Sequence, residues 1–181
     1  MTKWPERTRG WEDALILRTR NLLEDTAKRF GLDCKWDASG PVEVACRYPA
    51  QAGLDFDLGF SLSHDEFICW GEHWYADIFP ADDEGNWNDI VGVVEGLVSG
   101  DARVLLYHAL GRTKPYWTEV QVRRIDKWAS VSTGVGCAVP PIIRPIILQN
   151  GLPPRRGNAK FAYGSILLLL VVGAAAFMLM T

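Results

Sequence analysis

The chain has 181 residues, with 19 Lys and Arg against 22 Asp and Glu, which gives a formal net charge of −3. This length suffices for one domain whose core needs no disulfide bonds. All 22 acidic residues and 15 of the basic ones lie in residues 1–128, a balance of 15 − 22 = −7 that argues against nucleic acid as a partner.

The first twenty residues carry charges every few positions and contain no apolar stretch. A secretory signal is therefore not expected, and the acidic part of the chain should remain in the cytoplasm. The four cysteines are widely spaced and include no CxxC pair: Cys34, Cys46, Cys69 and Cys137. In a chain without an export signal this pattern predicts free thiols, mostly buried.

The first predicted element is a helix over roughly residues 10–30. Ile16, Leu23, Ala27 and Phe30 recur at helical spacing, and Gly31 is a typical residue just after a helix. The period then changes to two. Apolar residues alternate with polar or small ones in VEVACRY (42–48) and DFDLGFSLS (55–63), as in strands buried on one face.

The stretch EFICWGEHWYADIF (66–79) predicts a β-hairpin closed by the two-residue loop Gly71-Glu72. This register pairs Trp70 with His73 and Cys69 with Trp74. Large rings then lie on both faces of the hairpin, Trp74 and Phe67 on one side and Trp70, Tyr75 and Phe79 on the other.

An apolar stripe from Trp87 to Val98 predicts a second helix, capped by Asn86 or Asn88 and ended by Gly100. Two or three strands follow, near 102–109, 116–122 and 127–133. With a weak strand near 34–37, the sequence predicts an α+β domain over residues 1–137, in which an antiparallel sheet of about six to eight strands packs against two helices.

Residues 138–157 hold five of the ten prolines, and residues 138–160 are predicted to be a basic, proline-rich linker because proline removes amide donors and fixes φ. The apolar residues within it leave two alternatives open. Ile142, Ile143, Ile146, Ile147 and Leu148 either pack back onto the domain or rest at a membrane interface.

Residues 161–180, from Phe161 to Met180, contain no charge. As a helix they would span about 30 Å, the thickness of the hydrocarbon core of a bilayer. Arg155, Arg156 and Lys160 flank the N-terminal side of this segment, and basic flanks tend to stay cytoplasmic. The pattern resembles the topology of tail-anchored membrane proteins, with the domain in the cytoplasm and the C-terminus outside or lumenal.

Motifs that carry chemistry are missing: the sequence has no GxSxG, GxxxxGK[ST], GxGxxG or HExxH. Strand parity sends Cys69 and His73 to opposite faces, which argues against a shared zinc ion. His64 is interpreted as a turn residue, Asp55 and Asp57 as a solvated face, and His108 as a hydrogen-bonded core histidine. No catalytic residue, metal or cofactor is expected.

The aromatic residues of the hairpin and second helix carry the only binding hypothesis. The candidate binding residues are Trp70, Trp74, Tyr75 and Trp87, with Asp82 and Asp83 on an acidic rim. Either helices cover both faces of the sheet, or one aromatic face is open to a partner or an apolar ligand.

These patterns predict a single-pass membrane protein that presents a cytosolic α+β interaction domain to membrane-associated protein partners. The alternative is a small membrane-tethered enzyme or a domain that binds an apolar ligand in an aromatic cleft. A concave pocket with a histidine and a carboxylate would favour this alternative, and a flat aromatic patch would favour the interaction domain.

Overall fold

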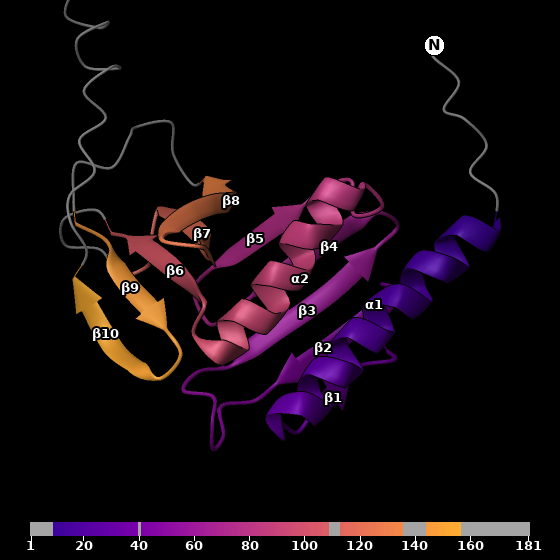
Figure 1. Cartoon of the computed structure of the whole chain (residues 1–181), viewed down its shortest axis with the longest axis horizontal. Helices are drawn as coiled ribbons and strands as arrows, with labels where there is room; N and C mark the ends of the chain where they lie inside the picture. The colour runs from indigo at the N-terminus through magenta and orange to yellow at the C-terminus, as the bar shows by residue number, and fades with distance from the viewer. Residues whose placement is uncertain (1–8, 40, 109–112, 136–143, 157–181) are drawn as a thin grey trace, which may run out of the picture.

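A computed structural model describes residues 9–39, 41–108, 113–135 and 144–156 (Figure 1). The elements in chain order are α1 (Arg9–Phe30), β1 (Lys35–Trp36), β2 (Val44–Tyr48), β3 (Leu58–Ser63), β4 (Glu66–Trp70), β5 (Tyr75–Ile78), α2 (Glu84–Ser99), β6 (Ala102–Tyr107), β7 (Trp117–Arg124), β8 (Lys127–Val135), β9 (Ile146–Gln149) and β10 (Leu152–Arg156). The predicted α+β class is confirmed.

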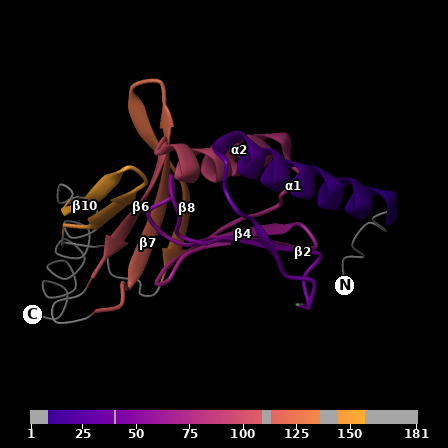
Figure 2. The same cartoon turned by 90° about the horizontal axis from the view of Figure 1, so that it is seen from below.

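The strands form two antiparallel sheets rather than the single sheet expected. The first sheet has the order β1-β2-β3-β4-β5, and the second has the order β10-β9-β6-β7-β8. The chain passes from one to the other through α2, whose buried side packs against strands of both. Figure 2 shows α1 and α2 on the same side of the first sheet, with the second sheet standing at a steep angle at one end.

The main core lies between the helices and the first sheet. Alternate residues of β2, β3 and β4 are buried on the helix side, including Cys46, Tyr48, Phe60 and Phe67. The rings of Tyr48 and Phe60 meet edge to face with centroids 5.3 Å apart, and the Tyr48 hydroxyl donates to the Leu23 carbonyl of α1. The alternation in the sequence therefore reports the burial of one sheet face.

The β4–β5 hairpin has a longer loop than the predicted Gly71-Glu72 turn. Trp70 pairs with Tyr75 and Cys69 with Ala76, so the loop contains residues 71–74. The Trp74 ring packs onto the loop itself, since a Cβ at Gly71 would lie 2.4 Å from Trp74 Nε1. Because the register differs by two residues, the residues that remain in the two strands keep their predicted faces, whereas His73 and Trp74 belong to the loop.

The helix ends follow ordinary capping chemistry. Gly31, with φ of 65°, follows α1, and Gly100, with φ of 87°, ends α2 as predicted. The cap of α2 is Asp83 rather than Asn86 or Asn88, because the Asp83 carboxylate accepts a hydrogen bond of 3.0 Å from the Asn86 amide N–H.

The predicted linker over 138–160 is wrong for its described part, where residues 146–156 form the β9–β10 hairpin. β9 pairs with β6, and β10 is the outer strand of the second sheet. Pro153 and Pro154 fit there because an edge strand tolerates missing amide donors, and the register shifts between Leu152 and Arg155. Ile147 is buried, so the hairpin packs back onto the domain.

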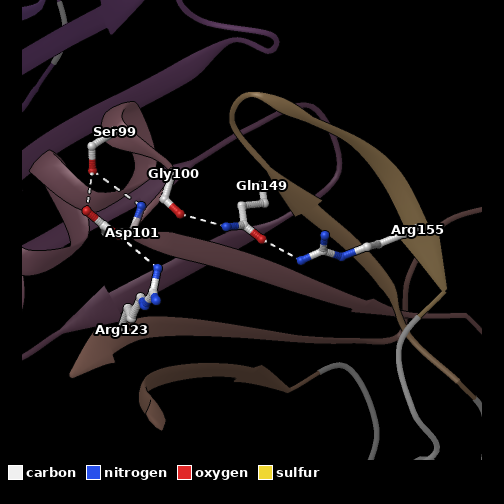
Figure 3. A network of polar contacts seen from close by, with 6 residues as sticks. All are labelled: Ser99, Gly100, Asp101, Arg123, Gln149 and Arg155. Carbon is white, nitrogen blue, oxygen red and sulfur yellow. Dashed lines mark hydrogen bonds and ion pairs between the residues drawn. The ribbon is translucent and has the colours of Figure 1, made fainter. Parts of the chain in front are cut away.

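Side chains of the hairpin bind the C-terminal end of α2 (Figure 3). Gln149 Nε2 donates to the Gly100 carbonyl at 2.7 Å and Gln149 Oε1 accepts from Arg155 at 2.8 Å. In the same region Asn150 donates to the carbonyls of Gly53 and Val98. The hairpin is therefore attached to the body by polar contacts as well as by strand pairing.

The predicted membrane span, residues 161–180, and Lys160 lie outside the described residues. Arg155 and Arg156, predicted to flank the membrane in a linker, belong to β10. Among the residues that the structure describes, no helix is both long enough and apolar enough to cross a bilayer.

Candidate functional site: a cleft between the two sheets

The side of the first sheet opposite the helices is the candidate functional surface. Both helices lie on the other side, so in the described part of the chain the expectation that helices cover both faces is wrong (Figure 2). Tyr75 is 54% exposed and Phe79 is 58% exposed. Large rings on this side therefore contact solvent.

A cleft of about 1170 Å³ opens between the two sheets. We call it the inter-sheet cleft. The first sheet and its loops line it with Lys35, Trp36, Asp37, Ala45, Cys46, Arg47, Ala50, Asp55, Phe56, Asp57, Gly59, Trp70, Gly71, Glu72, His73 and Trp74, and the second sheet with Leu106, His108, Ile146 and Leu148. Its position between sheets explains why no single sequence motif marks it.

Trp70 and Gly59 form part of the cleft wall together. The Trp70 ring lies so close over β3 that a Cβ at Gly59 would be 2.1 Å from it. Gly59 is thus needed for the ring to lie flat against the strand. Phe56 and Trp74 add further aromatic surface, and Trp74 is buried.

Two carboxylates of the cleft, Asp55 and Asp57, accept hydrogen bonds from other parts of the chain. Asp57 accepts a hydrogen bond from Arg47 and one of 2.6 Å from the Ala50 N–H. The Ala50 N–H, followed by Arg47, lowers the pKa of the Asp57 carboxyl below its ordinary value. Asp55 accepts a hydrogen bond of 2.7 Å from the Gly151 N–H. Asp55 is exposed and Asp57 is partly exposed, so these carboxylates hold loops in place and also form a solvated face as predicted.

Two histidines line the inter-sheet cleft from opposite sides. His73 Nε2 lies 3.4 Å from Glu72 Oε1, and His73 is 47% exposed. His108 Nε2 is buried and has no hydrogen-bond partner within the described ranges. Within the described residues, the prediction of a hydrogen-bonded core histidine is therefore not met at this nitrogen.

The other chemical candidates lie elsewhere. His64 has a positive φ of 56° in the β3–β4 turn, where its N–H donates to Glu43 at 3.0 Å. Cys69 is buried on the helix side of the first sheet, and burial raises its pKa to about 12. His73 faces the cleft instead. No cluster of three metal-ligating side chains occurs in the part of the chain that the structure describes.

The structure brings together only some of the predicted binding residues. Trp70 and Trp74 line the cleft, and Tyr75 lies on the open side of the sheet without lining it. Trp87 is buried in α2 beneath the Arg18 guanidinium, 4.1 Å from the ring centroid. Asp83 is occupied as the cap of α2, and Asp82 precedes it, half-buried.

The sequence analysis missed several cleft residues. Lys35 and Arg47 come from β1 and β2, and Ile146 and Leu148 come from β9. A usable signal was present in the isoleucine-rich stretch around residue 146, since so many apolar residues are unusual in a linker. Lys35 and Arg47 gave no such signal in the sequence, because only the fold brings these charged residues to the cleft.

Comparisons of the chain with protein families, with characterised proteins and with solved structures found no match. What the inter-sheet cleft binds is therefore inferred from its own residues.

Proposed function

We propose that the protein is a membrane-anchored binding domain that takes an apolar or amphipathic small molecule into the inter-sheet cleft. The observation that carries this proposal is the cleft of about 1170 Å³ with walls of Phe56, Trp70 and Trp74. Ligand sites combine such apolar walls with a few polar groups, and this volume slightly exceeds their usual range of about 300–1,000 Å³. His108 Nε2, which has no hydrogen-bond partner among the described residues, supplies a polar group.

Membrane attachment through Phe161–Met180 would place this cleft near a bilayer. β10 ends at Arg156, five residues before Phe161. Five extended residues reach at most about 18 Å. β9, which pairs with β10, contributes Ile146 and Leu148 to the cleft. A lipid-like ligand therefore suits the site, and the basic residues before the span favour a cytoplasmic domain.

The test uses a chain that ends at Gly157, first shown by circular dichroism to be folded, and an apolar fluorescent probe such as anilinonaphthalene sulfonate. Ala45 lines the cleft on β2, so the ring of Ala45→Phe should protrude into it and weaken probe binding at least about tenfold, or roughly 1.4 kcal/mol. Tyr75→Ala, outside the cleft, is the matched control. Equal probe affinity in the folded Ala45→Phe variant and the parent would rule out the cleft as the ligand site.

A second candidate function is binding of a membrane-associated protein on the open side of the first sheet. The observation that favours it is the exposure of two aromatic side chains. Tyr75, at the start of β5, is 54% exposed, and Phe79, directly after β5, is 58% exposed. Exposed aromatic residues are enriched in protein interfaces. Tyr75→Ala should then weaken recovery of a partner with detergent-extracted full-length protein while leaving the melting temperature nearly unchanged. Unchanged recovery of every co-purifying protein would count against it.

An enzymatic role has less support than binding. A general base needs a titratable group within hydrogen-bond reach of a substrate and a partner that orients it. Asp57 is engaged by Arg47 and Ala50, and Asp55 is engaged by Gly151. Asp55 and Asp57 are thus occupied by structural contacts. The contact in the cleft that favours an enzymatic role is that of His73 Nε2 with Glu72 Oε1, 3.4 Å apart on an exposed loop.

A further inference from the structure

Two cysteines meet at the edge of the first sheet. Cys34 lies directly before β1, and Cys46 lies in the middle of β2. Their Sγ atoms are 2.6 Å apart. A disulfide bond is about 2.05 Å long, so the two sulfur atoms need only a small approach to bond. Both are free thiols in this structure, as the sequence predicted.

Backbone contacts on both sides of Cys34 keep it near Cys46. The Asp33 N–H donates to Gln51 Oε1 at 2.8 Å, and Gln51 Nε2 donates back to the Asp33 carbonyl at 3.2 Å. After Cys34, Trp36 pairs with Cys46, and the Asp37 N–H donates to the Ala45 carbonyl at 3.0 Å. The close approach of the thiols is therefore built into the connection between α1 and β2.

The two thiols differ in access and in acidity. Cys34 is half-buried, whereas Cys46 is 2% exposed. The hydrogen bond with Cys46 lowers the pKa of Cys34 below its ordinary value, against the opposing effects of burial and of Glu24. The same hydrogen bond, together with burial, raises the pKa of Cys46. Cys34 is thus the thiol that reacts first with a reagent in solution, because the thiolate is the nucleophile.

We propose that Cys34 and Cys46 are a reversible redox site that forms an intramolecular disulfide by exchange with a small disulfide such as glutathione disulfide. The Cys34 thiolate attacks one glutathione sulfur, the S–S bond breaks, and one glutathione thiolate leaves. Cys46 then gives up its proton and attacks Cys34 Sγ, which expels the second glutathione. Two protein thiols are oxidised, and one glutathione disulfide is reduced to two glutathione molecules.

The disulfide would fix the edge of the inter-sheet cleft. β1 contains only Lys35 and Trp36, both exposed and both lining the cleft. It is held to β2 by two paired residues. A bond between Cys34 and Cys46 ties this short edge strand covalently to β2. The redox site does not depend on what the cleft binds, since it rests on the geometry of the two thiols alone.

The test uses full-length protein in detergent, equilibrated in mixtures of reduced and oxidised glutathione, quenched with acid and alkylated. Trypsin cleaves after Arg29, Lys35 and Arg47, so the two cysteines fall in the separate peptides 30–35 and 36–47. We expect a disulfide-linked pair of these peptides to become the major species as oxidised glutathione increases, and to disappear with dithiothreitol. Separate alkylation of both peptides at every ratio would overturn the proposal.

Variants distinguish the roles of the two thiols. Cys46→Ala should accumulate a glutathione adduct on Cys34, because no thiol remains to expel the glutathione. Cys34→Ser, at the more exposed position, should leave Cys46 without a glutathione adduct. This variant replaces Cys46→Ala in the test if Cys46→Ala does not fold. Cys69→Ala, in β4, is the matched control and should form the Cys34–Cys46 link as the parent does. An adduct on Cys34 of the parent that never resolves, or a link from Cys34 to Cys137, would contradict the pairing.

Discussion

The strands β2–β5 and the β9–β10 hairpin are held in the fold by different forces. β2–β5 bury alternate side chains against α1 and α2, and Phe60 and Phe67 are fully buried there. The β9–β10 hairpin buries Ile147 but is also fastened by side chains that bind backbone groups. Asn150 binds the Val98 carbonyl, and Gln149 binds the Gly100 carbonyl (Figure 3). Apolar burial is non-directional, whereas these hydrogen bonds fix one position for the hairpin.

This difference determines how each region responds to change. A strand in β2–β5 keeps its place as long as its apolar face matches the helices. The hairpin depends on distant groups, since Asn150 bonds to Gly53 and Val98, about 97 and 52 residues away in sequence.

The largest change in stability is expected between two truncated chains, one that ends at residue 137 and one that ends at Gly157. A chain that ends at residue 137 loses β9, which covers Leu105 and Tyr107 with Ile147 and adds Leu148 to the edge of the main core. At about 1.5–3 kcal/mol for each of these two side chains, Ile147 and Leu148, the free energy of unfolding should fall by roughly 3–6 kcal/mol. A chain that ends at Gly157 keeps both sheets and should be soluble without detergent. Urea unfolding of the two chains measures the difference, and equal midpoints would show that the hairpin is dispensable.

A cavity in the first sheet should cost nearly as much. Phe60→Ala removes a fully buried ring that contacts Tyr48 and Phe67, so the free energy of unfolding should fall by about 3–5 kcal/mol. The matched control is Tyr75→Ala on the open side of the same sheet, where a change within about 0.5 kcal/mol is expected. A large loss in the Tyr75 variant would mean that this ring is part of the core.

A smaller loss is expected at the hairpin turn. Asn150→Ala removes the donor to the carbonyls of Gly53 and Val98 and the acceptor, at 2.9 Å, for the Asp55 N–H. Leaving such groups without partners costs about 1–3 kcal/mol. Leu152→Ala on the exposed edge strand is the control. If both variants unfold at the parent's urea midpoint, the hairpin is held by apolar burial instead.

The smallest effect is a pH dependence at Asp57. Its pKa is lowered in the folded state by the Ala50 N–H and Arg47, so the carboxylate favours folding above its unfolded pKa of about 3.9. This contribution is lost as the pH falls through the lowered pKa. Asp57→Asn should therefore lower the urea midpoint slightly at pH 7 and less at acid pH, because the contribution fades as the pH falls through the lowered pKa, with the exposed Asp126→Asn as control. An equal difference at both pH values would assign the effect to another cause.

Much of the helix and strand content was predictable from the sequence because it follows from local rules. Apolar alternation around Phe60 identified β3, helical spacing identified both helices, and Gly31 and Gly100 marked their ends. The faces of the residues within β4 and β5 were also predicted correctly, but Trp74, predicted on the face opposite to that of Trp70, lies in the loop and lines the cleft with it. A register error of two residues does not change which side of a sheet a side chain occupies.

The sequence by itself determined the α+β class and the buried face of the first sheet, because local periodicity encodes both. It also named the aromatic residues directly. Only the tertiary structure decided that the strands divide into two sheets and that Pro153 and Pro154 lie in an edge strand. It also decided that Trp70 and Leu148 line one cleft. These features depend on contacts between residues far apart in the chain, which no local pattern specifies.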